Sequence, residues 1–237
     1  MKRLLAGLAL GFALNSNCLA KQFTPQSALP TGETISIKEL RMRPAAAKEL
    51  RVSLKRFDSG EFRDSARHLE KAIRMDDQVP AAHHNLGVCY LRLREYAKAA
   101  DEFQRASDLD PRLIAPRISL AGAFFVLGRY PDAERAAGEA YQLDPANPAA
   151  RYWLSRILAT EGHDTPEVQE MLRASRVHFP AAHLVLASLL LKQKATKEAL
   201  FELQEYLGRP DAPEKSKVAC MIERLNDSGQ ASTCVMN

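Results

Sequence analysis

Three stretches of the chain align without gaps and decide its fold: GEFRDSARHLEKAIRM (Gly60–Met75), REYAKAADEFQRASDL (Arg94–Leu109) and GRYPDAERAAGEAYQL (Gly128–Leu143). Each stretch begins thirty-four residues after the one before it. Self-similarity at a fixed period of about 20 to 50 residues is typical of proteins built from stacked structural units. The sequence therefore predicts a repeat array instead of a single closed core.

The columns of this alignment indicate what each unit looks like. Two columns hold small residues: Ser53, Gly87, Ala121, Ser155 and Ala187 in the first half of each unit, and Ser65, Ala99, Ala133 and Ala199 in the second. Two antiparallel helices approach closely only where the facing side chains are small. Apolar residues three to four positions from these columns form a helical stripe, which in the second helix is predicted to hold Leu69, Phe103, Met171 and Leu203. One such hairpin cannot bury its stripe alone, so it must stack on neighbouring hairpins.

This period and this apolar pattern closely resemble the tetratricopeptide repeat family. The resemblance implies an all-α protein, an α-solenoid of about five helix-turn-helix units. We place these units near residues 46–79, 80–113, 114–147, 148–179 and 180–211. Terminal units of such an array are expected to be atypical, because one of their sides has no neighbouring repeat.

The segments that flank the array have patterns of their own. Val218, Ile222 and Leu225 share one face of a polar segment, so residues 212–227 are predicted to form a cap helix. The last residues, 228–237, are predicted to be a flexible tail. Ahead of the array, Ile35 and Ile37 alternate with polar residues, which predicts that residues 21–43 form an extended arm.

Residues 1–20 have the pattern of an export signal. Lys2 and Arg3 precede an apolar run from Leu4 to Leu14, and small residues at Cys18 and Ala20 suit cleavage before Lys21. A membrane anchor is one alternative, but about eleven apolar residues are too few to cross a bilayer, which takes about twenty. A lipoprotein modified at Cys18 is another, although the polar residues before Cys18 suit it poorly. We expect an exported protein, periplasmic or secreted.

The charge pattern excludes some classes of partner. The chain has 33 Lys and Arg against 29 Asp and Glu, and the two signs alternate along the helical segments. Such alternation is typical of solvated helix faces, whereas a nucleic-acid binder concentrates basic charge on one face. We therefore expect no nucleic-acid partner, and we expect no transmembrane segment after removal of the signal.

The sequence carries no signature of catalysis, of a cofactor or of a metal site. No glycine-rich phosphate loop, nucleophile elbow or paired-carboxylate motif is present. His83 and His84 are adjacent, and adjacent residues on a helix point about 100° apart, which does not suit a shared metal ion. We expect a protein that is not an enzyme and that needs no cofactor.

The cysteines leave one alternative open. Cys89 lies in a helical segment and is predicted to be a small core residue. Cys220 and Cys234 would close a short loop, and an exported protein can keep such a disulfide. Two separate thiols are the alternative, because sequence does not fix cysteine pairing.

The resemblance places function on a concave groove lined by the first helix of each unit. The candidate groove residues are Leu50, Leu54, Phe57, His84, Val88, Leu91, Arg92, Ile118, Phe125, Val126, Tyr152, Arg156 and Lys192. The family's chaperone-binding subtype grips a carboxylate with Lys and Asn side chains, and only Asn85 matches that pattern. We expect an interaction scaffold for a protein or peptide partner. A structural protein whose groove is filled by its own arm, or by another copy in a homo-oligomer, is the alternative.

A packing argument favours a groove that is open to a partner. Leu86, Tyr90, Leu120 and Phe124 already supply a stripe for stacking the units. Leu91 and Phe125 belong to a second apolar face, which would be exposed unless something covers it. The alternative is that this second face packs between adjacent first helices.

Overall fold

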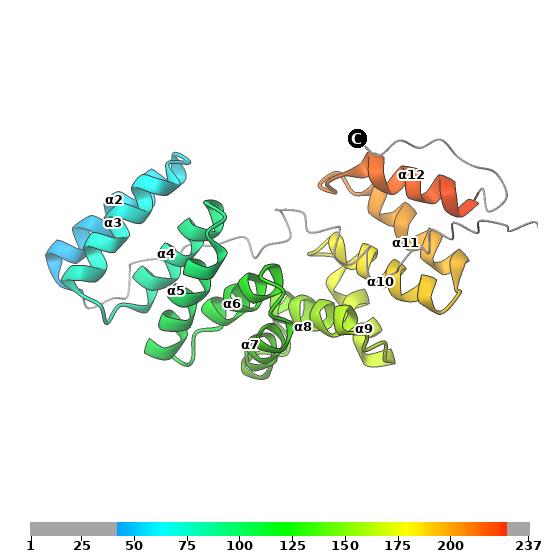
Figure 1. Ribbon diagram of the computed structural model, residues 1–237, viewed down its shortest axis with the longest axis horizontal. Coiled ribbons are helices and arrows are strands. Elements are labelled where there is room, and N and C mark those ends of the chain that lie inside the picture. The colour runs from blue at the N-terminus through cyan, green and yellow to red at the C-terminus, as the bar shows by residue number, and fades with distance from the viewer. Residues whose placement is uncertain (1–41, 227–237) are drawn as a thin grey trace, which may run out of the picture.

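The protein is described by a computed structural model, which places residues 42–226, and in that range it forms eleven helices and no strands (Figure 1). The helices are α2 (Pro44–Asp58), α3 (Phe62–Met75), α4 (Pro80–Arg92), α5 (Tyr96–Leu109), α6 (Ile114–Val126), α7 (Tyr130–Leu143), α8 (Pro148–Glu161), α9 (Pro166–Ser175), α10 (Ala181–Lys192), α11 (Thr196–Gly208) and α12 (Lys215–Asn226). The prediction of an all-α solenoid of helix-turn-helix units is confirmed.

One backbone turn recurs in all five hairpins. The residue that ends each turn has a positive φ: Gly60 (77°), Arg94 (62°), Gly128 (73°), Gly162 (97°) and Lys194 (63°). The amide after it donates a hydrogen bond to a carbonyl five residues earlier, as from Glu95 to Tyr90 and from Arg129 to Phe124. This is the Schellman ending of a helix, which satisfies carbonyls that have no partner within the helix. The turn reverses the chain so that the second helix runs back along the first.

The small columns lie where the two helices of a hairpin cross. A Cβ atom added to Gly87 on α4 would lie 2.6 Å from Cε1 of Phe103 on α5. Phe103 and Ala99 are fully buried at this crossing. The absence of a side chain at position 87 therefore lets a large ring fill the space between the helices.

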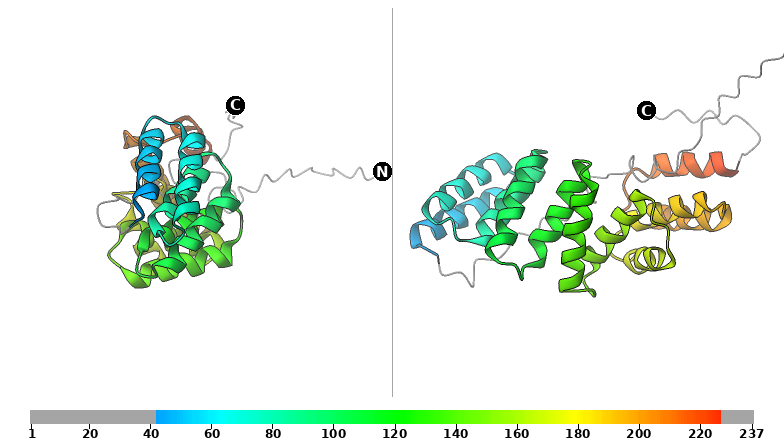
Figure 2. Two further views of the ribbon diagram at one scale, coloured as in Figure 1. Left: turned by 90° about the vertical axis from the view of Figure 1, so that its left-hand side faces the viewer. Right: turned by 60° about the horizontal axis from the view of Figure 1, so that its bottom comes forward.

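The helices form two layers along a curved array (Figures 1 and 2). The first helices pack on one another as α4 on α6, α6 on α8 and α8 on α10, while the second helices α3, α5, α7 and α9 pack on the first helix of the following unit. Elements that stay in contact along a curved stack lie on its inner side. The first helices therefore form the inner, concave layer, as the resemblance implied.

The buried apolar residues form two clusters. The larger one runs from Val88 in α4 to Val218 in α12, and the smaller one lies between the first unit and α4 and includes Leu50, Leu69 and Leu86. Val218 in α12 is fully buried, and α12 packs on α11. The last helix thus covers the end of the array.

The fourth unit departs from the predicted register. The sequence alignment placed Met171 in the buried stripe of the second helix, which is wrong: Met171 is half-buried, and Leu172 is fully buried instead. The reason is the longer turn of this hairpin, in which α8 ends at Glu161 and α9 begins only at Pro166. The extra residue shifts the buried positions of α9 forward by one.

The predictions at both ends of the chain fall outside the described residues. These are the export signal at residues 1–20, the arm up to residue 41 and the tail at residues 228–237. Within residues 42–226, none of the helices has the length and apolar character that a membrane crossing requires.

Candidate partner groove

The thirteen candidate groove residues all lie on first helices, but they differ in exposure. Buried are Leu50, His84, Val88, Leu91, Ile118, Phe125, Tyr152 and Arg156. Half-buried are Leu54, Phe57 and Val126, while Arg92 and Lys192 are exposed. The sequence argument identified the helices that carry the candidate residues, but it did not predict how far each side chain is buried.

The expectation that Leu91 and Phe125 belong to an exposed apolar face is wrong. Leu91 is 5% exposed and Phe125 is 4% exposed. The physical reason is that successive first helices pack on one another, so that the Phe125 ring of α6 meets the Trp153 ring of α8 edge to face at 5.8 Å. These residues belong to the core cluster that joins the units.

Arg156 lies at the centre of a cluster of aromatic rings. Its guanidinium carbon lies 4.6 Å from the centroid of the Phe125 ring and 5.3 Å from that of Trp153. Its Nη1 donates a hydrogen bond of 2.9 Å to the hydroxyl of Tyr152, and the Tyr152 ring stacks on Phe179 at 4.5 Å. We call Phe125, Tyr152, Trp153, Arg156 and Phe179 the Arg156 cluster.

Burial sets the electrostatics of the Arg156 cluster. Arg156 is 1% exposed, and a desolvated guanidinium over an aromatic ring is stabilised by about 2 kcal/mol. Burial raises the pKa of the Tyr152 hydroxyl, although the positive charge of Arg156 opposes this shift. Arg156 therefore does not present its charge at the surface of the groove, whereas the candidate residue Lys192 is exposed.

Two members of the Arg156 cluster were not among the predicted groove residues. Trp153 is 1% exposed, and its indole N–H has no hydrogen-bond partner within residues 42–226. Its adjacency to Tyr152 on a first helix was the available signal. Phe179 lies in the connection before α10, where the repeat pattern makes no prediction.

Three histidines form hydrogen bonds to glutamates within hairpins. Nδ1 of His83 on α4 lies 2.7 Å from Glu102 on α5, and Nδ1 of His183 on α10 lies 2.7 Å from Glu202 on α11. In the first unit the two residue types are exchanged, with His68 2.6 Å from Glu49. All three pairs are nineteen residues apart. No group of three or more His, Cys, Asp or Glu side chains in the described part of the chain could hold a metal ion.

The two described cysteines differ in state. Cys89 is fully buried, and burial raises the pKa of its thiol to about 11, so it is a core residue without reactivity. Cys220 in α12 is disulfide-bonded. The proposed partner, Cys234, lies outside the described residues, so this pairing stays a prediction.

Repeated hairpins, a shared turn and an inner layer of first helices define the chain as a helical repeat protein. The model of the tetratricopeptide repeat family matches residues 54–113 and 119–165. These two stretches of the chain are tetratricopeptide repeats. Tetratricopeptide repeats are protein–protein interaction modules, and the tetratricopeptide repeat family consists of scaffolds instead of enzymes.

Known proteins resemble the chain in sequence or in structure. A curated relative, stress-induced-phosphoprotein 1 of Caenorhabditis elegans, is 26% identical over 154 residues, which cover 61% of this chain and 47% of that protein. The chain thus spans about half the length of this relative.

Among solved structures, PilF of Pseudomonas aeruginosa is similar with a TM-score of 0.63 and 20% identity, over 77% of this chain and 85% of that one. YrrB, described as having an unusual peptide-binding site, is similar with a TM-score of 0.61 and 18% identity, over 76% and 92%. MamA of Desulfovibrio magneticus has a TM-score of 0.61 and 15% identity, over 80% and 99%. At these identities the likeness shows the fold alone.

Proposed function

We propose that this protein is a non-enzymatic scaffold or adaptor of the cell envelope that holds a peptide or protein partner at its concave face. The observation that carries the proposal is the inner layer of first helices, at whose ends the exposed cations of Arg92 and Lys192 and the half-buried side chains of Phe57 and Val126 lie. Partly exposed apolar side chains near exposed cations suit a segment with apolar and acidic side chains. The envelope location rests on the pattern of residues 1–20.

The exposed residues of the inner layer define where a partner makes first contact. Arg92 at the end of α4 and Lys192 at the end of α10 are exposed, and Phe57 and Val126 are half-buried. All four lie at or next to the last residue of a first helix, beside the hairpin turns. An acidic partner segment would contact the two cations, and its apolar side chains would contact Phe57 and Val126.

The test is capture of a partner from an envelope extract of the producing cells by the immobilised chain beginning at Lys21, followed by mass spectrometry. Arg92→Glu together with Lys192→Glu should weaken capture, and the loss should depend on salt because exposed charges are screened. Lys197→Glu, at an exposed position of α11, is the matched control. Unchanged capture by the double variant, with helical circular dichroism preserved, would place the binding surface elsewhere.

A second candidate function is a structural protein whose groove is filled by its own arm or by another copy. The observation that favours it is the unbroken buried run of α4 from Ala81 to Cys89. With 3.6 residues per turn, such a run includes residues on every face of the helix, the concave face among them. In the groove-filling candidate, the arm or another copy covers the part of the concave face that packing between units leaves open.

Deletion of residues 21–41 separates the two candidate functions. If the arm fills the groove of a neighbouring copy, the full chain should form a concentration-dependent oligomer that the deletion abolishes. If the arm fills its own groove, both forms should be monomeric and the deletion should increase binding of the hydrophobic dye ANS. Light scattering coupled to gel filtration, together with dye fluorescence, measures both. A monomer with unchanged dye binding would contradict the groove-filling candidate.

A further inference from the structure

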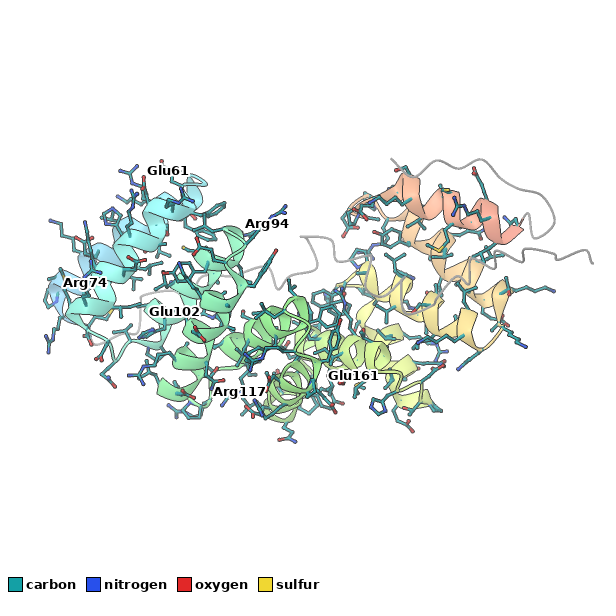
Figure 3. The ribbon with its side chains drawn as sticks, viewed as in Figure 1. Glu61, Arg74, Arg94, Glu102, Arg117 and Glu161 are labelled. Carbon is teal, nitrogen blue, oxygen red and sulfur yellow. The ribbon has the colours of Figure 1, made fainter. Side chains whose placement is uncertain are left out.

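A polar hollow lies outside the concave groove, at the junction of the second and third units. It has a volume of about 380 Å³ and is lined by residues of α5, α6 and α7. Volumes of about 300 Å³ and more are typical of small-molecule sites. Figure 3 shows Arg117, one of its lining residues, beside α6 and α7, on the side of the array opposite to Arg94.

The hollow exists because two repeat columns hold small residues here. The position of Ser107 on α5 is occupied by Ile73 in the first unit and by Tyr141 in the third. The position of Ala136 on α7 is occupied by Glu102 in the second unit and by His68 in the first. Both departures remove side-chain volume, and both residues line the same hollow. Stacking the units does not require either departure, since the first unit carries larger side chains at both positions.

Ser107 supplies an independent sign that a polar ligand belongs in the hollow. The residue is 5% exposed, and its hydroxyl has no hydrogen-bond partner within residues 42–226. Buried hydroxyl groups are almost always hydrogen-bonded, and each exception calls for an explanation. Because Ser107 lines the hollow, a group bound there would complete its hydrogen bonding.

Charges of both signs surround this hydroxyl. The side chain of Arg117 is 12% exposed, and its Nε lies 3.2 Å from Glu139. Asp108 accepts a hydrogen bond of 2.8 Å from Gln104 and makes no ion pair within the described part of the chain. The apolar side chains of Leu120 and Phe124, both nearly buried, line the hollow as well. The hollow therefore offers a cation, an anion, a hydroxyl and an apolar surface.

We propose that this hollow binds a small zwitterion of the amino-acid type. The ligand's carboxylate faces the guanidinium of Arg117, its ammonium group faces Asp108, and Ser107 hydrogen-bonds to one of the two. Its aliphatic part lies against Leu120 and Phe124. Charged hydrogen bonds to both ends of one molecule fix its orientation, so a ligand with both charges is favoured over a ligand with either one. This site is independent of the partner proposed for the concave groove.

Three probes of similar size test the class of ligand: L-norvaline, which carries both charges, butylamine, which lacks the carboxylate, and pentanoate, which lacks the ammonium. Saturation-transfer NMR at millimolar probe concentration measures binding to the chain that begins at Lys21. We expect norvaline to bind about tenfold more tightly than either analogue, because each analogue can make only one of the two charged hydrogen bonds. No binding of norvaline, or equal binding of all three probes, would overturn the proposal.

Two variants locate the site without removing a core side chain. Ser107→Ile introduces the residue that the first unit carries at this position, and it should fill the hollow and abolish norvaline binding. Asp108→Asn should weaken binding about fivefold, whereas Asp101→Asn, at an exposed position of the same helix, should leave it unchanged. Circular dichroism verifies that each variant is folded. Norvaline binding that survives both Ser107→Ile and Asp108→Asn would overturn the assignment to this hollow.

Discussion

At the scale of single residues, the hairpin turns show how one backbone position constrains the sequence. Three of the five turns place glycine at the residue with positive φ, but Arg94 (62°) and Lys194 (63°) adopt the same conformation with a side chain. For residues other than glycine, this region brings Cβ close to the carbonyl oxygen and costs about 1–2 kcal/mol. The second and fifth hairpins therefore hold local strain that the first, third and fourth avoid.

Replacing Arg94 by glycine should therefore stabilise the protein. We expect Arg94→Gly to raise the free energy of unfolding by about 1 kcal/mol, since glycine relieves the strain at the Schellman position. Urea denaturation followed by circular dichroism measures the change. The reciprocal control is Gly128→Ala, which should lower stability by a similar amount because Gly128 has a φ of 73°. Destabilisation by Arg94→Gly would show that the arginine side chain contributes more than the strain costs.

Gly87 is constrained by packing instead of by backbone conformation. A Cβ atom there would lie 2.6 Å from the ring of Phe103, which is fully buried. We expect Gly87→Ala to lower the free energy of unfolding by about 1–3 kcal/mol, the usual cost of overpacking. Gly138→Ala on α7 is the matched control: it meets no atom within 4 Å and should raise stability by about 0.5–1 kcal/mol through helix propensity. If the two substitutions had equal effects, the close crossing of α4 and α5 would be contradicted.

At the scale of helices, the repeat period was enough to predict most of the fold, because the same small and apolar columns recur in each hairpin. The sequence could not predict the register of α9, since one additional residue in the turn before Pro166 moves burial from Met171 to Leu172. Nor could the sequence predict that the side chains of Phe125 and Arg156 would be buried. Their burial depends on contacts with the ring of Trp153, which lies in a different unit from Phe125.

The last hairpin should lose stability in acid. Glu202 on α11 accepts hydrogen bonds of 2.7 Å from His183 and Arg176. Burial alone would raise the pKa of Glu202, but these two donors hold it below the ordinary value of 4.5. A lowered pKa in the folded state means that the stabilisation is complete above pH 4.5 and is lost as the pH falls through the folded-state pKa. Acid unfolding should therefore begin below pH 4.5.

The variant Glu202→Gln isolates this contribution. At pH 7 it should lower the free energy of unfolding by about 1.5–3 kcal/mol, the range for hydrogen bonds to charged groups. The difference from the unsubstituted protein should shrink as the pH falls below 4.5 and through the lowered pKa of Glu202, as Glu202 itself becomes protonated. Denaturant midpoints measured across this range supply the comparison, with the exposed Glu205→Gln as the control. A difference that stayed constant with pH would assign the effect of Glu202 to packing instead of charge.

At the scale of the whole molecule, the array has an open, curved shape in which each unit packs mainly on its neighbours (Figure 2). The stability of such an array is approximately a sum of unit and interface contributions, so opening can start at one end. The central helix α6 is buried from Ile118 to Phe125, whereas α2 buries only Ala46, Leu50 and Ser53. The first unit has one neighbouring hairpin, and the third has two.

Amide hydrogen exchange should follow this gradient. We expect the slowest exchange in α6 and α8, which the Arg156 cluster joins, and faster exchange in α2, because local opening costs less where fewer apolar side chains are buried. The difference in opening free energy between α6 and α2 should be roughly 2–4 kcal/mol, the contribution of one or two fully buried side chains. Exchange measured by mass spectrometry on peptides of each helix resolves this difference.

Substituting Phe125 by leucine should remove ring contacts and reduce the difference in opening free energy between α6 and α2. Phe201→Leu, at an exposed position of α11, should leave that difference unchanged. Uniform protection from α2 to α11 would instead show that the array unfolds as a single cooperative unit.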